Sequence, residues 1–265
     1  ALLLWLTLPW TANDRHSPPG LPLANITAFS TGDNRELSPA FSPDGKWLAF
    51  NRMTHTCHSQ IWVRERHQHK EILLTESPGI YGAPTWSPDG KKVGFVESNY
   101  CDRENQIDFC QHLNQVSLDV AMVGPQTPTR LLNCHRGFIA QLRWKSNNEI
   151  FFLDRQNEVS RLMLLRHNQD TPIVKPLFQQ AQQHYVAFDY SQPHQKLAII
   201  GIDKENRFSM NIMDKTGTPI SQTEISNMLN IQPGNSISWH TPNETLVLAN
   251  ERSFFQITPS RKVHQ

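Results

Sequence analysis

The chain has 265 residues and a formal net charge of +1 at pH 7, from 25 basic and 24 acidic side chains. This near-zero charge gives no bulk attraction to nucleic acid, and no basic cluster is longer than two or three residues. Hydrophobic residues make up 38% and charged residues 18%, which is a globular rather than a disordered composition. The length suffices for one large core, and propellers or barrels of this size commonly form a single domain.

The N-terminal segment, residues 1–10, is apolar and uncharged and reads ALLLWLTLPW. A membrane-spanning helix needs about 20 such residues, so this segment is about half of one. Three interpretations are open: part of a transmembrane anchor, the apolar core of a secretion signal, or a buried strand. The first two place the rest of the chain outside the cytoplasm. Residues 11–20 are polar with two prolines and are predicted to be a linker, so that residues 21–265 form the folded domain.

An internal repeat follows this linker. Residues 26–45 read ITAFSTGDNRELSPAFSPDG and residues 71–90 read EILLTESPGIYGAPTWSPDG, and the two align without a gap at a spacing of 45. Each copy ends in Ser-Pro-Asp-Gly. Proline fixes φ at the first corner, aspartate bonds to nearby backbone and glycine accepts a positive φ, so this tetrapeptide predicts a tight turn. Residues rich in strand formers follow each turn, at 46–50 and 91–96.

Weaker copies of the unit continue to the end of the chain, each with an aromatic residue before its turn. These aromatics are Phe41, Trp86, Trp144, Tyr190 and Trp239, at spacings of 45, 58, 46 and 49. A period of about 40 to 50 residues with four short strands per unit is typical of propeller blades. We therefore predict an all-β β-propeller with four-stranded antiparallel blades, five in number, or six if one repeat is degenerate. The aromatics are expected to pack between blades.

The last blade is predicted from the number of residues left for it. Only 26 residues follow Trp239, which is short for a complete blade. Residues 26–31 align with a fourth strand and have no blade before them, so this N-terminal strand is predicted to complete the last blade and close the ring. The alternative is a short fourth strand at residues 261–263.

The Ser-Pro-Asp-Gly blades resemble the TolB-like propeller family. Residues 39–45 with 48–50 and residues 84–90 with 93–95 carry the resemblance, which is specific over 26–95 and fades afterwards. Such blades occur in TolB, a secreted periplasmic protein, in the propeller of prolyl oligopeptidases, and in the periplasmic part of membrane-anchored transcription regulators similar to ToxR and CadC. TolB carries an α/β domain before its propeller, whereas here about 25 residues that begin with an apolar half-span precede the first repeat. This arrangement resembles the regulators.

The resemblance implies a non-enzymatic sensor or scaffold at the periplasmic side of the inner membrane, held there by its N-terminal segment. It would bind a protein or a small-molecule signal on one propeller face, while DNA binding would belong to a separate cytoplasmic domain and no nucleic acid would bind this portion. The alternatives are a secreted TolB-like adaptor and the propeller of a prolyl-oligopeptidase-type enzyme without its catalytic domain. The sequence contains no Gly-x-Ser-x-Gly, no Walker loop and no Gly-x-Gly-x-x-Gly. We expect neither a catalytic residue nor a cofactor.

The chain has four cysteines, which are the candidates for disulfides: Cys57, Cys101, Cys110 and Cys134. An even number in an oxidising compartment favours disulfides, and four cysteines allow three pairings, which the sequence leaves open. The segment His55-Thr-Cys-His58 gathers thiol and imidazole groups that could bind zinc. Because the usual spacing of a zinc site is absent, a loop or a disulfide is favoured there and no metal is expected.

Strand alternation predicts which links of the blades share a face. Links between the first and second strands and between the third and fourth lie at one end of a blade, and all other links lie at the opposite end. All four cysteines fall in links of the second kind, and the link within residues 97–115 is the longest. Binding usually resides on long loops held by a rigid scaffold, so we predict a partner or signal face there. Its candidate side chains are those of His55, His58, Asp102, Arg103, His112 and His135.

Overall fold

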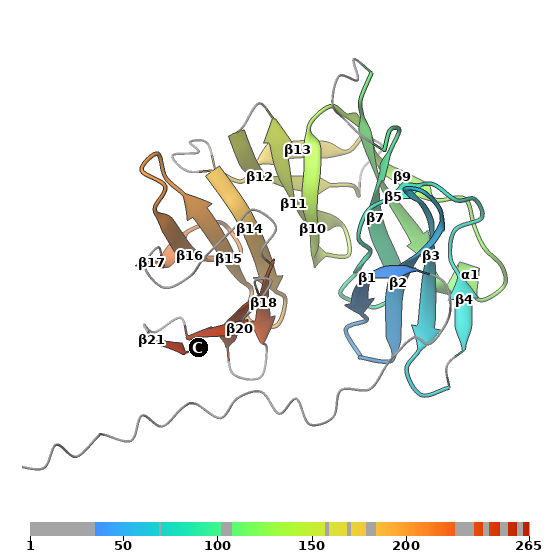
Figure 1. Ribbon diagram of the computed structural model, residues 1–265, viewed down its shortest axis with the longest axis horizontal. Coiled ribbons are helices and arrows are strands. Elements are labelled where there is room, and N and C mark those ends of the chain that lie inside the picture. Colours follow the sequence, from blue (N-terminus) through green and yellow to red (C-terminus); the bar gives the residue numbers. More distant parts are fainter. Residues whose placement is uncertain are drawn as a thin grey trace, which may run out of the picture.

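The computed structural model describes residues 35–68, 70–101, 108–156, 159–168, 171–178, 184–225, 236–240, 244–249, 254–258 and 262–264. These residues form five antiparallel sheets, four of them with four strands and one with five. Figure 1 shows that the sheets follow one another in chain order along an arc. The prediction of an all-β fold with four-stranded antiparallel blades is confirmed.

Successive strands pair with one another within each sheet. The first sheet contains β1 (Glu36–Phe41), β2 (Trp47–His55), β3 (His58–Glu65) and β4 (Glu71–Leu73). In the second, β5 (Ile80–Tyr81) and β6 (Thr85–Trp86) both pair with β7 (Lys92–Ser98), followed by β8 (Gln111–Ser117) and β9 (Thr129–His135). A four-residue helix, α1 (Leu118–Ala121), precedes β9. The third sheet contains β10 (Phe138–Ser146), β11 (Glu149–Gln156), β12 (Val159–Arg166) and β13 (Ile173–Pro176).

The last two sheets have the same order. The fourth contains β14 (His184–Ser191), β15 (Lys196–Ile202), β16 (Phe208–Asp214) and β17 (Pro219–Glu224). The fifth contains β18 (Ser236–His240), β19 (Thr245–Ala249), β20 (Phe254–Thr258) and β21 (Lys262–His264). The fourth strand of the fifth sheet is thus β21, the alternative that the sequence offered. The predicted closing strand, residues 26–31, lies outside the described residues. The edge of β20 that this strand was expected to pair with is occupied by β21.

The apolar segment 1–10 and the linker 11–20 also lie outside the described residues. In the part of the chain that the structure covers, no helix has the length and apolar character needed to cross a membrane.

The Ser-Pro-Asp-Gly turns are held by their own side chains. The Ser42 hydroxyl donates to a carboxylate oxygen of Asp44 at 2.5 Å, and the backbone N–H of Lys46 donates to the same oxygen at 3.0 Å. These bonds, that from Ser42 first, lower the pKa of Asp44, and Gly45 adopts the positive φ of 69° that closes the turn. Residues 87–91 repeat the pattern. The predicted turns are confirmed, and their aspartates serve the backbone.

Three buried tryptophans join neighbouring sheets by a repeated hydrogen bond. Each indole N–H donates to a backbone carbonyl on the innermost strand of the preceding sheet. The bonds run from Trp86 to Ala40 (2.9 Å), from Trp144 to Thr85 (3.2 Å) and from Trp239 to Asp189 (3.3 Å). In each case the acceptor immediately precedes the anchoring aromatic of its own sheet. The predicted packing of aromatics between blades is confirmed for the tryptophans, which are at most 8% exposed.

The other two aromatics behave differently. Tyr190 is half-buried and packs edge-on against Phe151 of the third sheet, with ring centroids 5.4 Å apart. Phe41 is 57% exposed, so the prediction of its burial between blades is wrong. Its neighbour Ala40 packs toward the second sheet, which turns Phe41 to the opposite face of β1. Among the described residues no sheet precedes the first one, whereas each tryptophan packs against the sheet before it.

A cluster of four charged side chains ties the four strands of the first sheet together. Arg52 on β2 reaches Glu36 on β1 at 2.6 Å and Glu71 on β4 at 2.9 Å. Arg64 on β3 pairs with the same two carboxylates. The guanidinium of Arg52 also lies over the ring of Trp62, 4.4 Å from its centroid. Because two positive and two negative groups share this largely buried site, removal of one leaves the others uncompensated.

A first prediction tests the tryptophan bonds. Trp144→Phe removes the N–H that bonds the Thr85 carbonyl, and the loss of such a hydrogen bond costs about 0.5–1.5 kcal/mol. Trp62→Phe is the control, because it removes the same atoms, leaves a phenyl ring beside the Arg52 guanidinium, and the Trp62 indole nitrogen has no hydrogen-bond partner among the described residues. Urea unfolding should show the Trp144 variant to be less stable than the control by about 0.5–1.5 kcal/mol. An equal loss of stability in the two variants would contradict a stabilising role for the Trp144 hydrogen bond.

A second prediction concerns pH. Hydrogen bonding to Arg52 is the largest of the effects that hold the pKa of Glu71 below its usual value of 4.5. The ionised carboxylate therefore stabilises the fold above pH 4.5, and this contribution is lost as pH falls through the lowered pKa. Glu71→Gln should lower the melting temperature at neutral pH, and its deficit should shrink below pH 4.5. Glu205→Gln, at an exposed carboxylate, is the control. A deficit for Glu71→Gln that is independent of pH would contradict this account.

Candidate functional site

The predicted partner face corresponds to one end of the first three sheets. There the chain links β2 to β3, β7 to β8 and β11 to β12, and there β4 and β9 lead into the next sheet. We call this end the cysteine face. The opposite end, the turn face, carries the Ser-Pro-Asp-Gly turns and the β3–β4 and β8–β9 links. Backbone bonds between these links, such as that from Leu118 N–H to the Lys91 carbonyl at 2.8 Å, hold the turn face together.

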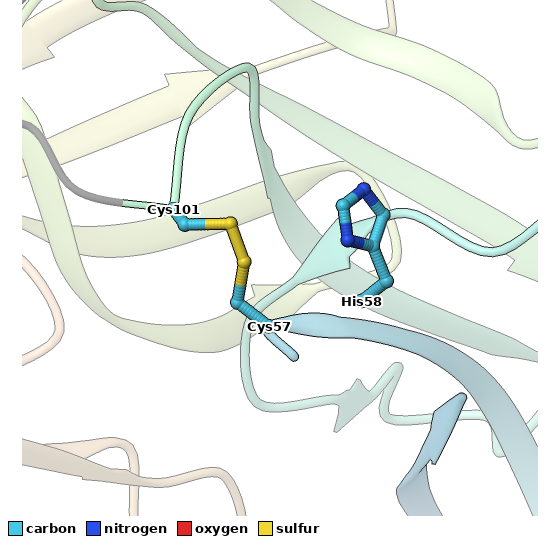
Figure 2. Close-up of side chains that lie close together, drawn as sticks. All are labelled: Cys57, His58 and Cys101. Atoms are coloured by element: carbon cyan, nitrogen blue, oxygen red, sulfur yellow. A yellow bond between two sulfur atoms is a disulfide. The ribbon is translucent and has the colours of Figure 1, made fainter. Parts of the chain in front are cut away.

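A disulfide joins the first two sheets on the cysteine face. Cys57 and Cys101 are bridged with their Cα atoms 5.9 Å apart, across 44 residues of sequence (Figure 2). Cys57 lies in the tight β2–β3 turn at a φ of +56°, and Cys101 lies near the start of the long β7–β8 link. The expectation of a disulfide is confirmed for this pair. A bridge over such a loop contributes roughly 2–4 kcal/mol.

His58 lies beside this bridge, as Figure 2 shows, and one of its ring nitrogens groups with the two sulfurs as possible metal ligands. The ligand atoms of Cys57, His58 and Cys101 are within 4.8 Å of one another. Zinc binds the thiolate form of cysteine. Because the two sulfurs here are bonded to each other in the disulfide, neither is a thiolate that could bind zinc. Nδ1 of His58 lies 3.3 Å from the Thr56 carbonyl, which orients the ring. His55, the register partner of His58, is exposed on the adjoining strand end.

The other two cysteines, Cys110 and Cys134, are free thiols. They lie on either side of His112, where the β7–β8 link ends and β8 begins. Cys110 is buried and Cys134 is exposed. The backbone N–H of Cys134 donates to Nδ1 of His112 at 3.0 Å, and Sγ of Cys110 lies 3.8 Å from Nε2 of the same ring. Burial, followed by the positive charge of Arg130, lowers the pKa of His112. The ring is therefore neutral at physiological pH.

An imidazole–carboxylate pair joins the second sheet to the third, with His135 at the end of β9 and Asp154 on β11. Nε2 of His135 is 2.8 Å from a carboxylate oxygen of Asp154, and both side chains are largely buried. Gln156 donates to the second oxygen of Asp154 at 3.1 Å. A pocket of about 150 Å³ opens here, lined by Asp154, Gln156, Val159 and Arg161. A carboxylate and a guanidinium in one small pocket can recognise a polar ligand that both donates and accepts hydrogen bonds.

The structure brings only some of the predicted side chains together. His58 joins the disulfide, His112 joins the free thiols, and His135 joins Asp154. Asp102 and Arg103 lie outside the described residues. Sequence reasoning missed Asp154, together with the rest of the pocket lining. The signal was available, because Asp154 directly follows an apolar run at residues 150–153, at the end where the cysteine links lie.

The comparisons bear on the fold. No family model matches the chain. Among solved structures, TolB from Acinetobacter baumannii superposes with a TM-score of 0.62 at 18% identity, over 84% of this chain and 51% of TolB. The fold is that of a TolB-like β-propeller. The same propeller occurs in the acylaminoacyl peptidase of Pyrococcus horikoshii (TM-score 0.59, 13% identity, 87% of this chain and 38% of that one). Prolyl oligopeptidase B from Galerina marginata superposes with a TM-score of 0.58 at 12% identity, over 84% of this chain and 32% of that one.

These likenesses concern the propeller alone, since the chain spans about half the length of TolB and about a third of the peptidases. Apart from α1, every helix or strand that the structure describes belongs to one of the five sheets. None of the described residues therefore builds a catalytic domain beside the TolB-like propeller.

A third prediction tests the His135–Asp154 pair through Gly137. A Cβ at Gly137 would overlap the Asp154 carboxylate and lie 2.7 Å from Nε2 of His135. Gly137→Ala should therefore separate the pair and destabilise the fold by about 1–3 kcal/mol. Gly124→Ala is the control, because a Cβ there meets no atom within 4 Å. Thermal unfolding and the imidazole NMR signals of His135 report the effect. Unchanged signals in a variant as stable as the control would contradict the arrangement.

Proposed function

We propose that this propeller is a non-enzymatic, extracytoplasmic binding module, and that its cysteine face binds a protein or a small-molecule signal. The observation that carries the proposal is the Cys57–Cys101 bridge, which anchors the start of the longest predicted link to the neighbouring sheet. A long loop that is tied to a rigid scaffold loses less conformational entropy on binding than a free one. The pocket beside Asp154 adds polar groups to the same face.

The disulfide also supports the extracytoplasmic location that we propose. Disulfides persist in secreted and periplasmic proteins and are rare in the cytosol, so the bridge fits an extracytoplasmic location. The proposal includes attachment of residues 1–10 to the membrane, with the propeller at the periplasmic side of the inner membrane. It assigns no cofactor and no nucleic acid to this portion.

Within this proposal, the lead role is that of the sensor portion of a membrane-anchored transcription regulator of the ToxR and CadC kind. A secreted TolB-like adaptor is the second candidate, and the likeness to TolB agrees with it. The propeller of a peptidase is the third, because acylaminoacyl and prolyl peptidases carry similar propellers. The complete coding sequence separates the three. A winged-helix domain and a full apolar span before Ala1 support the regulator, a short signal peptide supports the adaptor, and a following Gly-x-Ser-x-Gly domain supports the peptidase.

A fourth prediction tests the binding face directly. A photoreactive p-benzoylphenylalanine replaces Tyr100, which is 38% exposed beside the Cys57–Cys101 bridge. The matched control carries the same residue at Thr216, an exposed position in the β16–β17 link at the turn-face end of the fourth sheet. Irradiation in the native cells should give a covalent adduct from position 100 and none from position 216, resolved by intact mass and by gel. Adducts from 216 alone, equal yields from both positions, or none from either would each contradict binding at the cysteine face.

A further inference from the structure

The pairing of β8 with β9 is interrupted beside the free thiols. Gln111 pairs with His135 and Leu113 pairs with Leu132, so two residues of β9 lie opposite the single residue His112 of β8. This is a β-bulge, and Cys134, the second residue of the bulge, has a φ of +27°. A positive φ is strained for a residue with a Cβ, and bulges commonly redirect a side chain.

The bulge frees a backbone N–H, and His112 binds it. The N–H of Cys134 donates to Nδ1 of His112, so the neutral imidazole carries its proton on Nε2. That nitrogen is 3.8 Å from Sγ of Cys110, within range of an N–H···S hydrogen bond. One ring therefore fixes the backbone of one cysteine and contacts the sulfur of the other.

The two thiols differ in accessibility although they interact. Cys110 is 8% exposed and Cys134 is exposed. Burial raises the pKa of the Cys110 thiol to about 11, and the next cause is its hydrogen bond with Cys134. A thiol at the surface beside a buried one is the arrangement that thiol–disulfide exchange requires: the first is open to attack an external disulfide, and the second resolves the mixed disulfide.

We infer that Cys110 and Cys134 form a reversible dithiol that closes to a second disulfide by exchange with an external disulfide, such as oxidised glutathione or the disulfide of a thiol oxidoreductase. The Cys134 thiolate attacks one sulfur of the external disulfide, whose S–S bond breaks and releases the first thiolate. The Cys110 thiolate then attacks Sγ of Cys134 and releases the second. The two cysteines are oxidised, the external disulfide is reduced, and the two thiol protons pass through solvent to the departing thiolates.

The location gives this reaction a consequence. The Cys57–Cys101 bridge anchors the start of the β7–β8 link to the first sheet. Closure of Cys110 onto Cys134 would anchor the end of the same link to β9 of the second sheet. The external redox state would thus decide whether the link is held at one end or at both. This inference is independent of what binds the cysteine face.

A fifth prediction follows, and the sequence makes its readout direct. Trypsin places each cysteine in a separate peptide: 53–64, 93–103, 104–130 and 131–136. The intact, folded protein is equilibrated in glutathione buffers from reducing to oxidising, the thiols are trapped by alkylation, and the peptides are measured by mass spectrometry. Under oxidising conditions peptide 104–130 should be recovered linked to 131–136 and lighter by two hydrogens than the pair. It should return to two alkylated peptides under mild reduction, while 53–64 stays linked to 93–103.

Matched variants separate the steps of the exchange. Cys134→Ser should leave Cys110 unmodified in the folded protein, because the attacking thiol is gone and Cys110 is buried. Cys110→Ser should accumulate the mixed disulfide on Cys134, because the resolving thiol is gone. His112→Asn should shift the glutathione ratio at which the bridge is half-formed. Recovery of both peptides as alkylated monomers under oxidising glutathione would overturn the inference, as would a stable Cys134 mixed disulfide in the parent or linkage of either peptide to 53–64 or 93–103.

Discussion

The stacking of the sheets depends on the hydrogen bond from an indole N–H to the preceding sheet. Among the described residues, backbone pairing between sheets is limited to two isolated bridges that join the first sheet to the second, so apolar packing alone would leave most of the relative positions loosely defined. The bonds from Trp86, Trp144 and Trp239 fix a point on each innermost strand against its neighbour. Side-chain amides add further fixed points, as when the Gln111 carbonyl accepts from the N–H of Ile139 at 2.6 Å. Directed polar contacts between neighbouring sheets therefore hold the links of the cysteine face in place.

The junction between the third and fourth sheets shows what replaces the indole. The anchoring position there is Tyr190, which packs against Phe151. An ion pair supplies the polar contact instead: Nε of Arg143 lies 2.5 Å from a carboxylate oxygen of Asp189, whose other oxygen accepts from the N–H of Trp239. One carboxylate thus links three successive sheets. The fold keeps a directed polar contact at each of these junctions, even where the aromatic residue changes.

Sequence reasoning succeeded where structure is local. The turns at 42–45 and 87–90 hold themselves by bonds within a few residues, so their sequence is sufficient to predict them. Partners far apart in sequence could not be predicted, because they depend on how the sheets are stacked. The choice of Cys57 with Cys101, and the contact between His135 and Asp154, are of this kind. The exposure of Phe41 was missed because its position in the row of sheets, rather than its motif, determines what covers it.

The tryptophan bonds all run in one direction, from each donor sheet to the sheet before it, so the two ends of the row of sheets differ chemically. The second, third and fifth sheets each donate an indole N–H to the sheet before them, and the first, second and fourth sheets each offer the carbonyl that accepts it. At the C-terminal end the carbonyl of Ser238 occupies the acceptor position, one residue before Trp239. At the N-terminal end stands Phe41, whose phenyl ring has no N–H to donate. A further tryptophan-bearing unit could therefore be grafted after the fifth sheet with the existing chemistry, whereas a unit grafted before the first would require a new kind of junction.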